Sequence, residues 1–218
     1  MTQNVQARDD RRVQRTRQLL QEALVELTIQ QGFAAVTVRD ICEVAQVNRA
    51  TFYRHYLDKY DLLEQYGQQV HDLLDGGESR TGTEIQPYVS TDQAPAGLVR
   101  LLEQVQTNAR FYRVMLGPEG HPGFVQQIQK YIEDRIRSGL PPELISAQGQ
   151  APIELCLSSI SSGALGSIRW WLEHDMPYTP EQLAAFAVQF SIANLQVALA
   201  ATLPSPVKPN TTKKRVNP

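Results

Sequence analysis

Residues 37–59 contain the side chains whose types and spacing best suit a recognition chemistry. The segment reads TVRDICEVAQVNRATFYRHYLDK, and Arg49 and Thr51 stand near its centre. A guanidinium can donate two hydrogen bonds to the O6 and N7 atoms of guanine, and a threonine can contact a base edge or a thymine methyl group. These residue types therefore predict contacts to base edges in the major groove of DNA.

Two short helices joined by a tight turn are predicted to position these side chains. Thr37 can cap the first helix, whose first turn contains Asp40, and Asn48 can cap a second helix of about eight residues. Phe52 and Tyr56 are four residues apart and share the face that packs inward. The opposite face is then free to enter a groove about 12 Å wide.

Further side chains on this outward face can take part in the contact. Ala50 is small enough to let the helix N-terminus approach closely, and Tyr53 and His55 can donate hydrogen bonds to phosphate. Lys59 would add its charge to the N-terminal dipole of the next helix at a phosphate. Arg39, on the first helix of the pair, can also reach the groove.

A longer helix over residues 11–31 is predicted to support the pair, and Gly32 is its stop signal. Its apolar residues recur at helical spacing and form one face: Leu20, Ala23, Leu24 and Leu27. A fourth helix is expected to begin near residues 58–59. The expected buried residues of the short helix after Thr37 are Ile41, Val44 and Ala45.

The segment that contains these short helices resembles the DNA-binding domain of the tetracycline-repressor (TetR) family. The matching residues extend without gaps over about fifty positions: Gly32-Phe33, Thr37 to Ile41, Ala45 to Val47, Asn48 to Lys59, and Leu62-Leu63. Ala50 stands where glycine is frequent, and Leu57-Asp58 replaces a frequent Pro-Ser, so the operator sequence is not predicted. With Asn48 and Arg54 added, the candidate DNA contacts are Thr37, Arg39, Asn48, Arg49, Ala50, Thr51, Tyr53, Arg54, His55 and Lys59.

The resemblance implies an all-helical homodimer of roughly nine helices per subunit, in which a small-molecule inducer relieves repression. It also implies that residues 152–174 and 180–201 pair with the same helices of a second subunit. The alternative is that both helices only contribute to an intramolecular core. DNA geometry favours the dimer independently, because two recognition helices about 34–36 Å apart can read both halves of a palindrome.

Helical patterns extend over nearly the whole chain, which predicts an all-α fold. The expected organisation is an N-terminal helix-turn-helix domain over residues 1–60, a regulatory and dimerisation domain over residues 61–202, and a disordered tail over residues 203–218. A Gly-, Ser-, Thr- and Pro-containing connection is expected over residues 76–95. The later helices are expected near residues 96–109, 111–116, 124–137, 152–174 and 180–201.

The distribution of charge supports this division into a DNA-binding part and a regulatory part. The 218 residues have a formal net charge of −2, but residues 1–60 contain nine Lys and Arg against seven Asp and Glu, and the remainder contains twelve against sixteen. Only the first part is therefore expected to face a polyanion. Cys42 and Cys156 lie in apolar helical patterns and are expected to be buried, with no metal or cofactor. No signal peptide or membrane span is expected, and the cytosol is the expected location.

A ligand pocket is expected between the helices of the body, for a small apolar or amphipathic effector. Its candidate walls, each of which could instead be ordinary core, are Phe111, Tyr112, Met115, Phe124, Tyr131, Trp170 and Trp171. The leading hypothesis is a homodimeric regulator, a repressor released from operator DNA. The alternatives are an activator or a partner-controlled regulator. A helical enzyme or a pure interaction module is disfavoured, because no nucleophile, base and orienting group can be assembled as a catalytic set.

Overall fold

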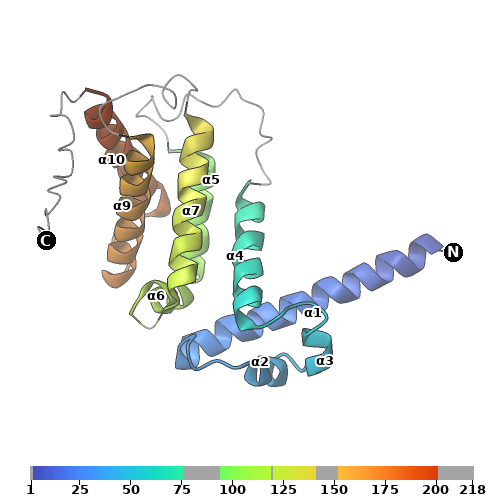
Figure 1. Cartoon of the computed structure of the whole chain (residues 1–218). Coiled ribbons are helices and arrows are strands. Elements are labelled where there is room, and N and C mark those ends of the chain that lie inside the picture. Colours follow the sequence, from blue (N-terminus) through green and yellow to red (C-terminus); the bar gives the residue numbers. More distant parts are fainter. Residues whose placement is uncertain (1, 76–93, 119, 141–151, 201–218) are drawn as a thin grey trace, which may run out of the picture.

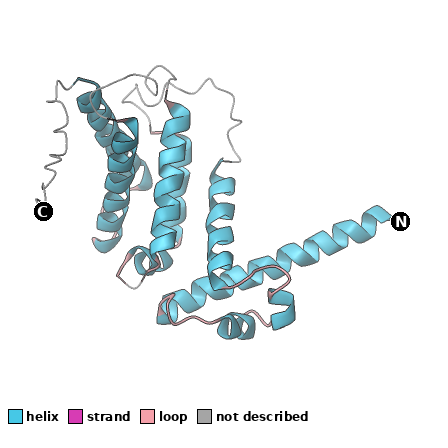
Figure 2. Cartoon of the chain, in the orientation of Figure 1, coloured by secondary structure: helices cyan, strands magenta, loops and turns pink. Residues whose placement is uncertain are grey.

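We describe the computed structural model of the chain over residues 2–75, 94–118, 120–140 and 152–200. Over these residues the chain forms nine helices and no strand, which confirms the predicted all-α fold (Figure 2). Residues 76–93 of the connection predicted over residues 76–95, and the tail predicted at residues 203–218, lie outside the described residues. The helices are α1 (Thr2–Gln31), α2 (Val38–Val44), α3 (Arg49–Phe52), α4 (Lys59–Asp75), α5 (Ala96–Thr107), α6 (Ala109–Leu116), α7 (Pro122–Gly139), α9 (Ile153–Glu173) and α10 (Pro180–Ala200).

The helices form a base and an upright bundle (Figure 1). Helix α1 crosses the base, with α2 and α3 beneath it, and α6 lies across the lower end of the bundle. Helices α4, α5, α7, α9 and α10 stand upright, and α4 rises directly from the base. Helix α4 therefore connects the two parts through its contacts with α1 and α7, and α1 also packs against α6.

One apolar core continues from the base into the bundle. Leu24 and Ile41 at the base belong to the same buried cluster as Phe111 and Trp171 in the bundle. All four side chains are almost completely shielded from solvent. Because the core is continuous, a displacement in one part is transmitted to the other by packing. The domain boundary near residue 60 stays a prediction.

Three details of the base differ from expectation. Helix α1 begins at Thr2, about nine residues before the predicted start, because no Gly or Pro interrupts the preceding residues. Regular α-helix in α3 ends at Phe52, and turn hydrogen bonds to the Phe52 carbonyl continue to Tyr56. Val44, which was expected to be buried, is exposed, because α2 is a short helix whose inward face is centred on Ile41; Cys42 is buried, as expected.

Candidate nucleic-acid interface

The capping of α2 fixes the first helix of the helix-turn-helix pair. The Thr37 hydroxyl accepts from the Asp40 N–H at 3.2 Å, and the Thr37 N–H donates to Asp40 Oδ2 at 3.1 Å. The same hydroxyl donates to Asp40 Oδ2 at 2.7 Å. These bonds from Thr37 lower the pKa of Asp40, since they stabilise the charged carboxylate. The predicted cap is confirmed, and the Thr37 hydroxyl is already engaged in it.

The turn between α2 and α3 is tight because Gln46 adopts a left-handed backbone conformation. Its φ angle is +54°, and the Val47 N–H donates to the Cys42 carbonyl at 3.0 Å. Asn48 then begins α3, and its Oδ1 accepts from the Ala50 N–H at 2.8 Å. Asn48 therefore caps α3, which confirms the prediction.

The two faces of α3 have opposite environments. Phe52 and Tyr56 are buried, with ring centroids 5.6 Å apart. Arg49 and Ala50 are exposed, and Tyr53 is 59% exposed although its ring contacts that of Phe52. The buried pair anchors the helix to the core, so that the other face is rigidly presented to solvent. Such a face can donate hydrogen bonds to base edges and phosphates.

Two basic residues extend this exposed surface. Arg54 is exposed and its Nη2 lies 3.5 Å from Thr51 Oγ1, and Arg39 on α2 lies 3.8 Å from Glu43. Both pairs are solvent-exposed and weak, so the guanidinium groups remain available to a polyanion.

His55 has a more restricted environment than the residues around it. It is half-buried, and burial lowers its pKa, with Arg17 and Arg54 adding a repulsion that acts in the same direction. The imidazole is therefore neutral at pH 7 and can donate only one hydrogen bond. The positive charge near His55 comes from the two arginines.

Lys59 lies in a different environment from the one expected. Its Nζ donates to the carbonyl oxygens of Phe33, Ala34 and Val36 at 3.0, 3.0 and 2.7 Å. The ammonium also lies 4.8 Å from the centroid of the Phe33 ring and 5.3 Å from that of Tyr60. Burial lowers its pKa. An ammonium has three donors, so Lys59 uses all of them to tie the turn after α1 to the start of α4.

The N-terminus of α4 is occupied by carboxylates. Asp58 Oδ1 accepts from the N–H groups of Tyr60 and Asp61 at 2.8 and 2.9 Å, and Asp61 Oδ2 accepts from the Leu57 N–H at 2.7 Å. A phosphate at this helix end would meet two negative charges. The phosphate contact predicted for Lys59 stays a prediction, and the geometry supports a holding role for this residue.

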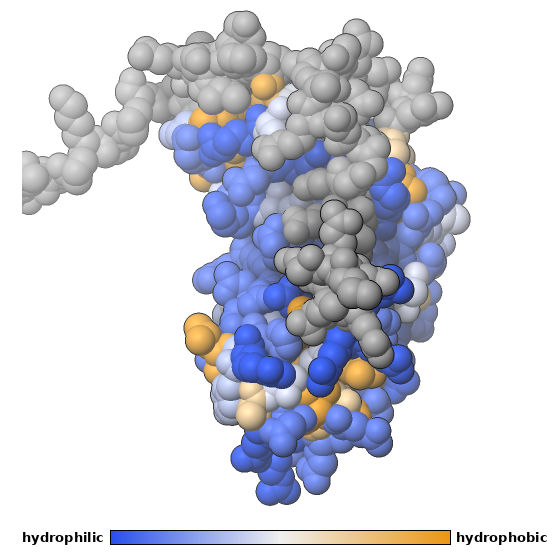
Figure 3. Space-filling model, turned by 90° about the vertical axis from the view of Figure 1, so that its right-hand side faces the viewer, coloured by the Kyte–Doolittle hydropathy of each residue, from blue (hydrophilic) through white to orange (hydrophobic). Residues whose placement is uncertain are grey.

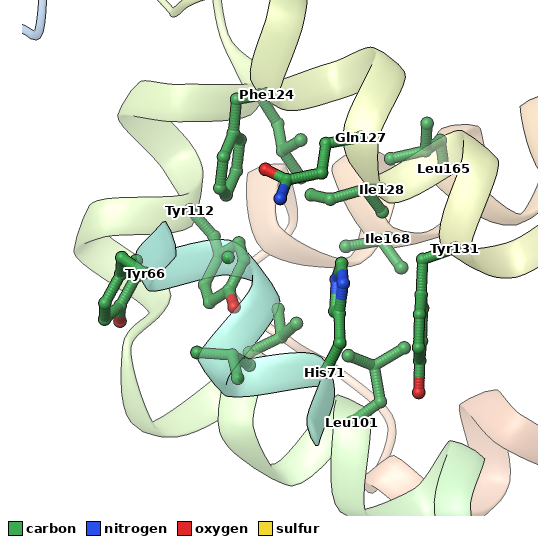
Figure 4. A pocket seen from close by; sticks show the side chains of 14 residues that line it. Tyr66, His71, Leu101, Tyr112, Phe124, Gln127, Ile128, Tyr131, Leu165 and Ile168 are labelled. Atoms are coloured by element: carbon green, nitrogen blue, oxygen red, sulfur yellow. The ribbon is translucent and has the colours of Figure 1, made fainter. Parts of the chain in front are cut away.

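The bundle contains a second candidate site, an internal cavity between α4, α5, α6, α7 and α9 (Figure 4). The cavity has a volume of only about 20 Å³, enough for about one water molecule. Its walls include three of the aromatic residues predicted for the pocket: Tyr112, Phe124 and Tyr131. Burial raises the pKa of Tyr112 far above its ordinary value, so this hydroxyl stays protonated.

The other four predicted wall residues do not line this cavity. Phe111, Met115 and Trp171 are buried in the core, where they contact neighbouring apolar side chains. Trp170 is 44% exposed on the surface. The two tryptophans are consecutive on α9 and point about 100° apart, and here Trp171 faces the core while Trp170 faces the surface.

Sequence reasoning missed several lining residues on α4 and α7. Gly67, His71 and Gln127 line the cavity, and the His71 ring stacks on that of Tyr131 with centroids 3.9 Å apart. A usable signal was present: Gly67 and His71 are four residues apart on the same apolar stripe as Tyr66 and Val70. A polar residue and a glycine within such a stripe indicate a site of close approach or binding.

Comparison with known proteins identifies the family to which the chain belongs. A family model described as bacterial regulatory proteins, tetR family, matches residues 20–66, and a model described as a transcriptional regulator C-terminal region matches residues 92–192. The chain belongs to the TetR family. This TetR-family chain is therefore a DNA-binding transcriptional regulator, and members of the family are not enzymes.

Individual relatives agree with the family assignment. Over 56 residues, the TetR-family chain is 46% identical to the uncharacterized HTH-type transcriptional regulator YxbF of Bacillus subtilis, a match that spans 25% of this chain and 15% of that protein. A TetR transcriptional regulator from Streptococcus agalactiae has a TM-score of 0.59 at 22% identity, over 84% of this chain and 97% of that one. SmeT, a repressor from Stenotrophomonas maltophilia, has a TM-score of 0.52 at 14% identity, over 88% and 97%. The solved structures show that the fold is shared.

Other classes of site find no support in the part of the TetR-family chain that the structure describes. There, no three His, Cys, Asp or Glu side chains come together in a group that could hold a metal ion. Within the same residues, no helix has the length and apolar character needed to span a membrane.

Proposed function

We propose that the chain is a homodimeric repressor whose α3 helix reads operator DNA. The observation that supports this most directly is the division of α3 into an anchored face and an exposed face. Phe52 and Tyr56 hold the helix in the core, and Arg49 and Tyr53 project from it. The proposed base and phosphate contacts are Thr37, Arg39, Asn48, Arg49, Ala50, Thr51, Tyr53, Arg54 and His55.

The exposed apolar residues of α9 and α10 support a dimer through these two helices. Trp170 and Phe190 are 44% and 60% exposed in the single chain, and Phe186 is also exposed. On α9, Gly163 and Gly166 have open space where a side chain would begin, which permits close approach of a second helix. By contrast, the described residues on the side of the molecule seen in Figure 3 are mostly hydrophilic, with scattered apolar groups.

The cavity supports control by a small, uncharged effector. Among the residues that the structure describes, no Asp, Glu, Lys or Arg lines it, so a buried charge on a ligand would have no partner among them. The helix-turn-helix is fully formed while the cavity is closed, which favours DNA binding without effector and release on its entry. A regulator of this kind acts in the compartment that contains the DNA. An activator, or a regulator controlled by a partner protein, is the second candidate.

Operator binding across a salt series tests this function. DNA selected from a random-sequence library by the purified chain should bind with an affinity that falls steeply as salt rises. In addition, Arg49→Ala should relax discrimination at one base pair by about 1–3 kcal/mol. A folded dimer that selects no DNA sequence would overturn the proposal. Removal of the chain from its host should raise transcription of the gene beside the operator, and a fall would support the activator.

A further inference from the structure

Helices α4 and α7 meet at a glycine on which a glutamine side chain rests. A Cβ atom added to Gly67 would lie 2.6 Å from Gln127 Oε1 and 2.9 Å from Gln127 Nε2. The same Nε2 donates a hydrogen bond to the Glu64 carbonyl oxygen at 2.9 Å. Glycine is unfavourable inside a helix, and here its missing side chain provides the space for the Gln127 amide.

The Gln127 amide also belongs to the cavity wall (Figure 4). In this view it projects from α7 between Phe124 and Ile128. The amide is one of the few polar groups among largely apolar walls, so an uncharged molecule that enters there would compete for its hydrogen bond. Such competition would remove the hydrogen bond that links α7 to α4.

Helix α4 is in turn firmly attached to the helix-turn-helix. Lys59 at its first residue ties it to three carbonyl groups of the turn between α1 and α2. Asp58 caps it, and Tyr56 immediately before it is buried in the core of the base. A shift of α4 therefore displaces α3 as well.

We propose that Gln127 is a latch residue whose contact with Gly67 and Glu64 holds α4 in the position that allows α3 to bind the operator. Release of the latch tilts α4 and weakens DNA binding. This inference rests on the proposed function. Gln127 touches no DNA in this scheme and acts through the position of α4.

Two single variants remove the contact between Gln127 and α4 in different ways. In Gly67→Ala, the new methyl group occupies the space that the flexible Gln127 amide fills and displaces that amide. Since alanine favours a helix, the midpoint of thermal unfolding should stay the same or rise, while operator affinity falls by about five-fold or more. Gln127→Ala removes the amide itself and should cause a similar loss of affinity. The double variant should lose no more than either single variant, because both remove one interaction.

Gln129→Ala is the matched control. Gln129 lies on the same helix, and its Nε2 donates to Ser162 Oγ on α9 at 3.2 Å, so its removal leaves the α4 contact intact. Operator affinity of this variant should equal that of the wild type.

Three results would overturn the latch: wild-type affinity in both single variants, additive losses in the double variant, or losses that follow a fall in thermal stability. If the wild-type chain binds no operator, the proposed function fails. If the wild type binds and Gly67→Ala and Gln127→Ala bind equally well, only the latch fails.

Discussion

At the scale of single residues, several polar side chains of the helix-turn-helix stabilise the local backbone. Thr37 and Asp40 complete a capping box, and Asn48 caps α3. Lys59 donates to three carbonyl groups. Polar residues of types that suit DNA binding thus bond to the backbone of the DNA-binding element and stabilise it.

Lys59→Met separates a holding role from a phosphate contact. The variant leaves two partly buried carbonyl groups and one exposed carbonyl group without their charged donor, and the free energy of unfolding should fall by about 1–3 kcal/mol. The slope of log affinity against log salt should stay unchanged. Urea unfolding and operator titrations over a salt series measure the two quantities. A slope smaller in magnitude by about 0.9, with unchanged stability, would instead show that Lys59 contacts a phosphate.

Asp40 should make the stability of the base depend on pH. Bonds from the Thr37 hydroxyl and N–H lower its pKa below the ordinary value of 3.8, so its ionised form is favoured by folding. This contribution is present above the pKa of the unfolded chain and is lost as the pH falls through the lower folded-state pKa. Asp40→Asn should therefore lose less stability than the wild type between pH 5 and about pH 2. Chemical unfolding at several pH values checks this, and identical profiles for the two proteins would refute it.

At the scale of elements, the angle between α2 and α3 depends on one strained residue. Gln46 has a φ angle of +54°, a conformation that glycine adopts without a steric penalty. A branched side chain is the least compatible with it. The backbone strain at Gln46 therefore lowers the stability of the α2–α3 helix-turn-helix.

Two substitutions at Gln46 should have opposite effects. Gln46→Gly relieves the contact of Cβ with the backbone and should raise the free energy of unfolding by about 0.5–1 kcal/mol. Gln46→Val should lower it by about 1 kcal/mol or more. Thermal unfolding of the two variants beside the wild type measures both changes. If glycine destabilised the chain, the side chain of Gln46 would matter more than its backbone.

At the scale of the whole molecule, operator binding is expected to depend on the proposed dimer. Phe186 and Phe190 are exposed in the single chain and four residues apart on α10. Neither ring belongs to the buried core, so their replacement leaves the core of one subunit intact, although Phe186 also contacts the ring of Tyr178 with centroids 5.3 Å apart. In a dimer through α9 and α10, the same rings would be buried between subunits.

The double variant Phe186→Gln/Phe190→Gln should shift the chain toward monomers. Its affinity for a two-half-site operator should fall by about 100-fold, because each half-site is then bound separately. Sedimentation velocity and operator titration provide the two readouts. Leu19→Gln, which changes an exposed apolar residue on α1, is the control and should remain dimeric. An unchanged dimer in the double variant would place the interface elsewhere.

Much of the DNA-binding element was predictable because its signals are local. The caps by Thr37 and Asn48 and the inward pair Phe52 and Tyr56 follow from residue type and helical spacing, and the structure confirms each of them. Hydrogen bonds within four residues and one-sided burial depend little on distant parts of the chain. The exposed position of Arg49 on α3 follows from the same periodicity.

Tertiary structure alone decided which partners the remaining polar side chains have. The ammonium of Lys59 bonds to carbonyl groups more than twenty residues away, and the Gln127 amide bonds to a carbonyl 63 residues away on α4. It also decided that Trp171 faces the core and Trp170 the surface, although both are equally apolar in the sequence. Contacts of this kind depend on how helices cross, which helical periodicity within one segment does not encode.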